Sequence, residues 1–294
     1  MRLFITGATG FIGSHVLVAL LAAGHEVRAL RRSPSSLPVI SLPCQPVWIE
    51  GELHSLKGSW LEGVHAVIHL AAVGVSPKPA SWSELLQVNV AGSLRLLALA
   101  SDCGVRRCVF AGTYHEYGTA ARSLMQYPPI PPNTPLEPLS AYGSSKLAAF
   151  QLLRVLAIEL NIEFFYGRIS SAYGDGQFEG NFWPSLRRAA LAGEDFAMTS
   201  GRQISDFIPV AAVAGHIIEA CKRPDIRAGV PLLANIGSGV ATTLLAFAEA
   251  EWDRLGATGK LMPGSLPDRS DRIARYVPDI LGLLIPTSPP TRNP

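Results

Sequence analysis

The chain has 294 residues, of which 48% are hydrophobic and 16% are charged, and its formal net charge is +2. This length and apolar content suit one large α/β unit or two lobes with a sizeable core. A net charge so close to zero, without any block of basic residues, argues against nucleic acid as a partner. The four cysteines show no CxxC spacing, so we expect free thiols in a reducing compartment and no metal site.

The start of the chain leaves no room for a signal peptide, because Met1 is followed almost at once by a glycine-rich turn. The longest apolar runs, such as residues 16–23, are far too short to cross a bilayer. We therefore expect a cytoplasmic protein with no membrane partner.

Residues 1–24 predict a strand, a tight turn and a helix. An apolar run at residues 3–5 is followed by a turn that contains Gly7, Gly10 and Gly13, and then by the apolar helix positions of residues 16–21. In the dinucleotide-binding fold, the first glycine makes the turn, the second lets a pyrophosphate approach the backbone, and the third lets the helix pack closely. The free N–H groups at the helix start would face that pyrophosphate. This pattern favours dinucleotide binding over a chance glycine-rich turn.

The second expected strand, residues 26–30, ends at Arg31 and Arg32. In NAD-binding versions of this fold an acidic residue at this point binds the adenosine ribose. Two guanidinium groups in its place favour the 2′-phosphate of NADP(H), although NAD(H) stays possible. Alternatively, Arg31 and Arg32 belong to a basic turn that is simply exposed to solvent.

Further along, expected strands and helices alternate. This alternation predicts a Rossmann-type, doubly wound parallel sheet followed by a smaller C-terminal substrate-binding lobe. We expect the dinucleotide-binding domain over residues 1–169, the second lobe mainly over 170–280, and a poorly ordered tail over 281–294. Expected strands lie at residues 47–49, 64–70, 107–111 and 163–169, and expected helices at 82–101, 142–160, 181–192, 210–221 and 243–255.

Tyr142 and Lys146 form a YxxxK pair, which places both side chains on one face of a helix. A free tyrosine, with a pKa near 10, is a poor acid or base at neutral pH, and a neighbouring ammonium group is expected to lower that pKa. Tyr142 could then exchange a proton with a substrate oxygen while a hydride moves to or from a nicotinamide. Thr113, at the end of the strand at 107–111, is placed to hold the same oxygen, although it could instead cap a turn.

Together these segments resemble the extended short-chain dehydrogenase/reductase family, and within it the NAD(P)-dependent nucleotide-sugar epimerase/dehydratase/reductase branch. The matching segments are Thr6–Gly13, His69–Ala72, Asn89, Thr113–Gly118, Tyr142 with Lys146, and Tyr173–Gly174.

The resemblance implies roles for individual residues. Thr113, Tyr142 and Lys146 match the catalytic residues of the family, and Tyr142 and Lys146 also contact the cofactor there. Relatives often dimerise through the helices that follow Trp82 and Tyr142, which implies a homodimer. The remaining cofactor positions would be Gly7, Thr9, Gly10, Phe11, Ile12, Arg31, Arg32, Leu53, Leu70, Ala71, Ala72 and Ile169, and the nucleotide-sugar positions would be Ser171, Asn181, Phe182, Arg202 and Arg269.

Departures from the family pattern narrow the set of reactions that we expect this chain to catalyse. The 4,6-dehydratases of this branch carry Asp-Glu after the threonine, whereas Tyr114 and His115 follow Thr113 here, so elimination lacks its carboxylates. The segment 112–118 resembles the GTxxEYG of reductases of 4-keto-6-deoxy nucleotide-sugars. Ser205 stands at the position where the family usually has an arginine that contacts the substrate diphosphate. Arg202 could take over this role only in part.

The sequence therefore favours an enzyme that reduces the 4-keto group of a nucleotide-linked 4-keto-6-deoxyhexose, with Tyr142 as proton donor. One alternative is an NAD-dependent nucleotide-sugar 4-epimerase that uses the same three residues. Another is a non-catalytic NADP-binding relative.

Overall fold

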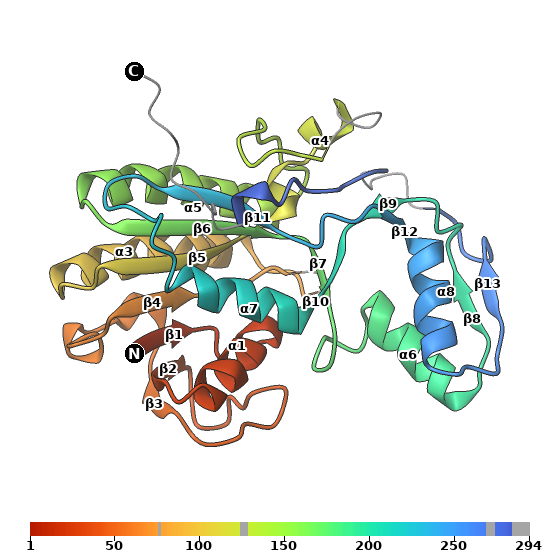
Figure 1. Cartoon of the computed structure of the whole chain (residues 1–294), viewed down its shortest axis with the longest axis horizontal. Coiled ribbons are helices and arrows are strands. Elements are labelled where there is room, and N and C mark those ends of the chain that lie inside the picture. The colour runs from red at the N-terminus through yellow and green to blue at the C-terminus, as the bar shows by residue number, and fades with distance from the viewer. Residues whose placement is uncertain (76–77, 124–128, 269–273, 284–294) are drawn as a thin grey trace.

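A computed structural model describes residues 1–75, 78–123, 129–268 and 274–283 (Figure 1). Its centre is a seven-stranded sheet with the strand order β11-β6-β5-β4-β1-β2-β3, in which every neighbouring pair is parallel. The α/β, Rossmann-type prediction is thereby confirmed. The strands are β1 (Arg2–Thr6), β2 (Glu26–Arg31), β3 (Val47–Glu50), β4 (Ala66–His69), β5 (Arg107–Thr113), β6 (Glu163–Ile169) and β11 (Leu232–Ile236).

Helices cover both faces of this sheet. On one face α1 (Phe11–Ala22) packs against α7 (Val210–Ala220), and both contribute to one apolar core cluster. On the other face α3 (Ser93–Asp102) packs against α5 (Ala141–Glu159) over a second cluster. Because all seven strands are parallel, their carboxyl ends meet at one edge, where ligands bind in folds of this type.

A second, smaller lobe lies beyond that edge (Figure 1). Its core is formed by aromatic and aliphatic side chains of α6 (Phe182–Ala192) and α8 (Leu244–Arg254), including Trp183, Phe247 and Trp252. Three short strand pairs connect and flank these helices: β7 (Ser171–Tyr173) with β10 (Phe207–Pro209), β9 (Ile204–Ser205) with β12 (Thr242–Thr243), and β8 (Phe196–Met198) with β13 (Leu261–Pro263).

The chain returns to the first lobe after residue 169. Helix α7 packs on α1, and β11 pairs with β6 at the edge of the large sheet. The part of the chain that we assigned to the second lobe is therefore shared between the two lobes. A 3-10 helix at Leu281–Leu283 packs against β11, and Arg223 Nη1 donates to the Gly282 carbonyl at 2.7 Å. Residues 284–294 of the expected tail lie outside the described residues.

The helix expected over residues 82–101 has three parts. Helix α2 (Trp82–Glu84) starts with a capping box between Ser81 and Glu84, a π-helix follows over Leu85–Gly92, and α3 completes the segment. A π-helical turn widens the backbone and often occurs at functional sites. Here it carries Asn89, whose contacts are described below.

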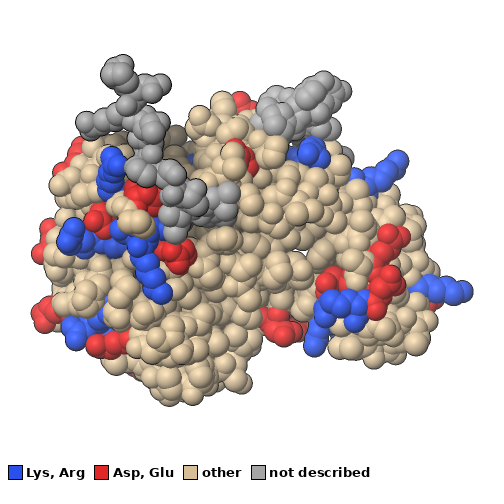
Figure 2. Space-filling view, in the orientation of Figure 1, with Lys and Arg blue, Asp and Glu red and all other residues tan. Residues whose placement is uncertain are grey.

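The surface shows both charged and apolar features. On the face drawn in Figure 2, acidic and basic side chains are interspersed on the two lobes, and the surface between them is mostly uncharged. Trp82, Leu86, Leu152, Val155 and Ile158 are large apolar side chains exposed on α2, the π-helix and α5. Among the helices described, none has both the length and the apolar character needed to span a bilayer.

Candidate functional site

The glycine turn after β1 has the geometry that the sequence predicted. Gly7 has a φ of +73°, and a Cβ there would lie 2.6 Å from the Ala71 backbone nitrogen. A Cβ on Gly13 would lie 1.9 Å from the Gly7 carbonyl oxygen, so α1 can approach the turn only because residue 13 is glycine. Gly10 is the N-cap of α1 and offers no side-chain hydrogen bond to the helix start. The N–H groups of the first helical turn are thus left for an anionic group.

A buried histidine connects this turn to the neighbouring elements. Thr6 Oγ1 lies 2.7 Å from His69 Nδ1, and His69 Nε2 lies 2.8 Å from Ser93 Oγ. Since the Ser93 hydroxyl donates to the Asn89 carbonyl (2.7 Å), His69 Nε2 carries a hydrogen and donates to Ser93 Oγ. Because the ring is buried, its neutral form is favoured, and in that form Nδ1 accepts from the Thr6 hydroxyl. Burial, with a smaller contribution from the Lys146 charge, lowers the pKa of His69 to about 3.

Asn89 extends the same network to the helix of Tyr142. Its side chain is fully buried, accepts from the Val73 N–H (2.9 Å) and donates to the Val73 carbonyl (3.0 Å). Its Nδ2 also donates to Ser145 Oγ (2.9 Å), and that hydroxyl donates to the Tyr142 carbonyl (2.8 Å). The loop after β4 and the start of α5 are thereby held together.

Thr113, Tyr142 and Lys146 come together at the carboxyl edge of the sheet. The side chains of Thr113 and Tyr142 are hydrogen-bonded to each other, and Lys146 lies one turn further along α5, where it is buried. Burial lowers the pKa of Lys146, and the Glu116 charge opposes that effect.

The pKa of Tyr142 shifts in the direction opposite to our expectation. Burial raises it, and the Glu116 carboxylate adds to the increase, while the hydrogen bond with Thr113 works the other way. Our prediction of a lowered pKa considered only the ammonium group one turn away. In the structure, the cost of burying a phenolate outweighs that attraction.

Arg31 is not a free guanidinium group. Its Nη2 pairs with Glu50 Oε1 at 3.2 Å, and its Cζ lies 4.9 Å from the centre of the Trp48 ring. Its Nε is buried and has no hydrogen-bond partner among the described residues. The neighbouring Arg32 is exposed. Glu50 thus offsets part of the charge on which our expectation of NADP(H) rested.

The remaining cofactor positions differ in accessibility. Leu70, Ala71, Ala72, Thr9, Phe11 and Ile12 are partly exposed around the glycine turn. Ile169 pairs in register with Thr113 and is buried at the end of β6. Leu53 is also buried, and its side chain packs against Gly92, where a Cβ would lie only 2.9 Å away.

The expected nucleotide-sugar positions are spread over the second lobe. Ser171 Oγ and Ser205 Oγ lie 3.2 Å apart. Phe182 packs edge-on against Phe196, and Asn181 is the N-cap of α6. Arg202 is largely exposed and lies 3.5 Å from the Asp268 carboxylate. Arg269 lies outside the described residues.

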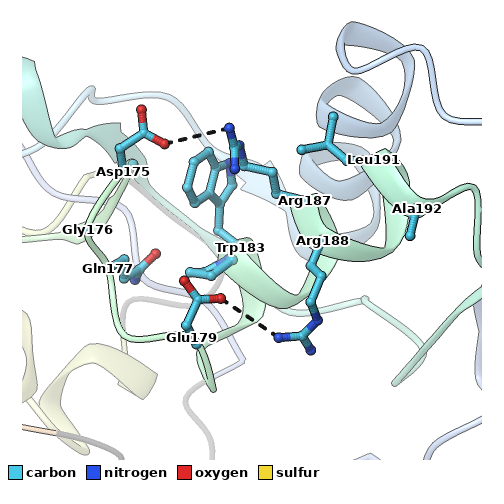
Figure 3. A pocket seen from close by; sticks show the side chains of 11 residues that line it. Asp175, Gly176, Gln177, Glu179, Trp183, Arg187, Arg188, Leu191 and Ala192 are labelled. Atoms are coloured by element: carbon cyan, nitrogen blue, oxygen red, sulfur yellow. Dashed lines mark ion pairs between the residues drawn. The ribbon is translucent and has the colours of Figure 1, made fainter.

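A hollow of about 420 Å³ lies between the loop that follows β7 and α6 (Figure 3). Two loose ion pairs cross it, from Arg187 to Asp175 at 4.0 Å and from Arg188 to Glu179 at 3.8 Å, and the Trp183 ring lies between them. Thr113, Tyr142 and Lys146 do not line it. Within the described part of the chain, no three His, Cys, Asp or Glu side chains are grouped so that they could hold a metal ion.

Sequence reasoning missed Glu116 and Arg168 as parts of this site. Both are fully buried, and Arg168 Nε donates to Glu116 Oε2 at 2.7 Å. They are 52 positions apart in the chain, and no local pattern marks them as partners.

Comparison with known proteins identifies a matching family and several similar epimerases. The model of the NAD dependent epimerase/dehydratase family matches residues 3–237. The UDP-glucose 4-epimerase of Corynebacterium glutamicum is 28% identical, over 81% of this chain and 76% of that protein. The UDP-glucose 4-epimerase of Erwinia amylovora is 29% identical, over 88% of this chain and 84% of that protein.

Solved structures share the architecture over almost the whole chain. MoeE5 in complex with UDP-glucuronic acid and NAD is 29% identical, with a TM-score of 0.80 over 96% of this chain and 91% of that one. TunA, an NAD-dependent NDP-hexosamine 5,6-dehydratase, is 27% identical, with a TM-score of 0.76 over 95% of this chain and 89% of that one. The fold, the site and these matches together show that the chain belongs to the NAD-dependent epimerase/dehydratase family, a class of enzymes that act on nucleotide-sugars.

The buried, neutral His69 makes stability depend on pH. An unfolded histidine binds a proton below about pH 6.5, whereas His69 in the folded protein does so only near pH 3, so stability falls as the pH decreases between these values. We expect the free energy of unfolding of the wild-type protein to fall more steeply than that of His69→Gln, by up to about 1.4 kcal/mol per pH unit. Urea unfolding at pH 7, 6, 5 and 4 measures this difference, and equal slopes would contradict a neutral His69.

Proposed function

We propose that the protein is an NAD-dependent nucleotide-sugar 4-epimerase. The observation that carries this proposal is the hydrogen bond between Thr113 and Tyr142, with the buried Lys146 one turn further along α5, at the edge where the glycine turn lies. The similarity to UDP-glucose 4-epimerases supports the choice of reaction.

The residues around the glycine turn fit a dinucleotide. A Cβ on Gly7 or Gly13 would collide with neighbouring backbone atoms, so these glycines let the turn and the start of α1 pack closely, and α1 starts there without a side-chain cap. Gly7 to Ile12 would hold the pyrophosphate through backbone N–H groups. Bound there, NAD supplies a hydride acceptor that later returns the hydride.

The protein's own groups handle the proton and orient the sugar. In its phenolate form, Tyr142 would take the proton of the C4 hydroxyl as the hydride leaves C4, and the resulting phenol would return the proton to the oxygen when the hydride comes back to the opposite face of the sugar. Thr113 donates a hydrogen bond to the same oxygen. Lys146 stabilises the phenolate form of Tyr142 while that form exists.

A 4-keto sugar reductase is the second candidate. The raised pKa of Tyr142 favours a protonated phenol, which is the form that donates a proton to a ketone. The pairing of Arg31 with Glu50 weakens the argument for NADPH, on which the reductase interpretation partly depended.

The function is tested with purified protein, NAD, and UDP-glucose or UDP-glucuronic acid as the sugar. We expect a new anomeric proton signal from the C4 epimer in a nuclear magnetic resonance time course. Tyr142→Phe removes the proton-transferring hydroxyl, and we expect it to lower the turnover at least about 100-fold.

Tyr173→Phe is the matched control, because the Tyr173 ring packs against Trp183 and Phe247 in the second lobe. It should retain turnover. Unchanged turnover in Tyr142→Phe would remove Tyr142 from the chemistry. Consumption of NADPH with a 4-keto nucleotide-sugar, without epimerisation of either probe, would favour the reductase.

Cofactor choice has a separate test. We propose that NAD(H) is preferred because Glu50 repels a 2′-phosphate and occupies Arg31. NADH should bind the wild-type protein at least as tightly as NADPH in a nicotinamide fluorescence titration. Glu50→Gln frees the guanidinium group and should tighten NADPH binding about ten-fold relative to NADH, equivalent to about 1.4 kcal/mol.

Glu52→Gln removes the same charge two residues away without touching Arg31, since Glu52 pairs with His54. It should leave the NADPH-to-NADH ratio unchanged. A preference of the wild-type protein for NADPH would overturn this proposal and support the prediction from the sequence that Arg31 binds the 2′-phosphate.

A further inference from the structure

The Glu116 carboxylate is completely buried at the end of β5, next to Thr113. Its Oε1 accepts hydrogen bonds from the Thr113 backbone N–H (2.9 Å) and from the Tyr166 hydroxyl (2.9 Å), and its Oε2 accepts from Arg168. Arg168 is itself enclosed by aromatic rings, with its Cζ 4.6 Å from the centre of the Phe150 ring. A buried ion pair rarely stabilises a fold more than apolar side chains of similar size, so stability alone does not account for it.

The turn that contains Glu116 packs closely against the neighbouring strand and against the helix of Tyr142. A Cβ on Gly112 would lie 2.3 Å from the Tyr166 ring and 2.9 Å from Glu116 Oε1. A Cβ on Gly143, next to Tyr142 in α5, would lie 2.7 Å from the His115 carbonyl oxygen. Glu116 thus lies in the 3-10 turn of Tyr114–Glu116, which directly follows the strand of Thr113 and packs against the helix of Tyr142.

We propose that Glu116 is a positioning residue of this site. Its carboxylate holds the end of β5 through the Thr113 amide, and its negative charge acts on the Tyr142 hydroxyl. This inference rests on the proposed function only in taking Tyr142 as the group that transfers the proton.

Other charged or titratable groups also face Tyr142 and Lys146. Glu116 is the carboxylate among them, and after burial it contributes most to the raised pKa of Tyr142. Replacing it with a neutral group should therefore lower that pKa, because a phenolate would no longer be repelled. The other groups are Tyr114 and His115 from the turn, Tyr166 from β6 and His69 from β4, while Arg168 pairs with Glu116 itself.

Glu116→Gln tests the charge while keeping an oxygen that can accept from Thr113. Full-length protein is labelled with ¹³C at the tyrosine Cζ carbons, and Tyr142→Phe identifies the Tyr142 signal among the seven tyrosines. Spectra are compared at the highest pH at which circular dichroism shows every variant folded. We expect the ratio of phenolate to phenol at Tyr142 to be at least about three-fold higher in Glu116→Gln than in the wild type.

Glu163→Gln is the matched control. The Glu163 carboxylate pairs with Arg107 at 2.8 Å and joins the same two strands, β5 and β6, at their opposite ends. It should leave the ratio at the wild-type value. An equal ratio in Glu116→Gln and wild type, or an equal increase in Glu163→Gln, would reduce Glu116 to a structural role. Because no substrate is present, this result does not depend on whether the proposed reaction is correct.

Discussion

A continuous chain of hydrogen bonds between the glycine turn and the helix of Tyr142 is the feature on which the site depends. It runs from Thr6 through His69 and Ser93 to the Asn89 carbonyl, and from the Asn89 side chain through Ser145 to the Tyr142 carbonyl. Burial favours the neutral form of His69, in which Nε2 donates to Ser93 and Nδ1 accepts from Thr6. Elements that would bind a cofactor and elements that would move a proton are therefore held in one arrangement, as transfer between closely placed groups requires.

Features that depend on local spacing could be predicted from the sequence. The glycine turn, the YxxxK pair and the alternation of strands and helices all follow from patterns of a few residues. The small strand pairs of the second lobe could not be predicted, because two or three residues carry no periodicity. Strand β11 was missed because its place at the sheet edge depends on β6, which is more than 60 residues earlier in the chain.

Electrostatic features were the least predictable. Charged residues are mostly exposed, so no pattern in the sequence indicates that Arg168 has a buried acidic partner. The pairing of Arg31 with Glu50 requires β2 and β3 to lie side by side, and only that contact shows how far the guanidinium group is neutralised. For the same reason the pKa of Tyr142 could not be derived from Lys146 alone, since burial and Glu116 act against it.

The central claim is that Tyr142 exchanges a proton with the C4 hydroxyl of a sugar while a cofactor lies on the glycine turn. A crystal structure of the protein grown with NAD and UDP-glucose tests it most directly. Our account predicts the pyrophosphate within hydrogen-bond distance of the backbone N–H groups at the start of α1, and the C4 hydroxyl within hydrogen-bond distance of Tyr142 and Thr113. A cofactor bound elsewhere, or a sugar whose C4 hydroxyl lies out of reach of Tyr142, would contradict it.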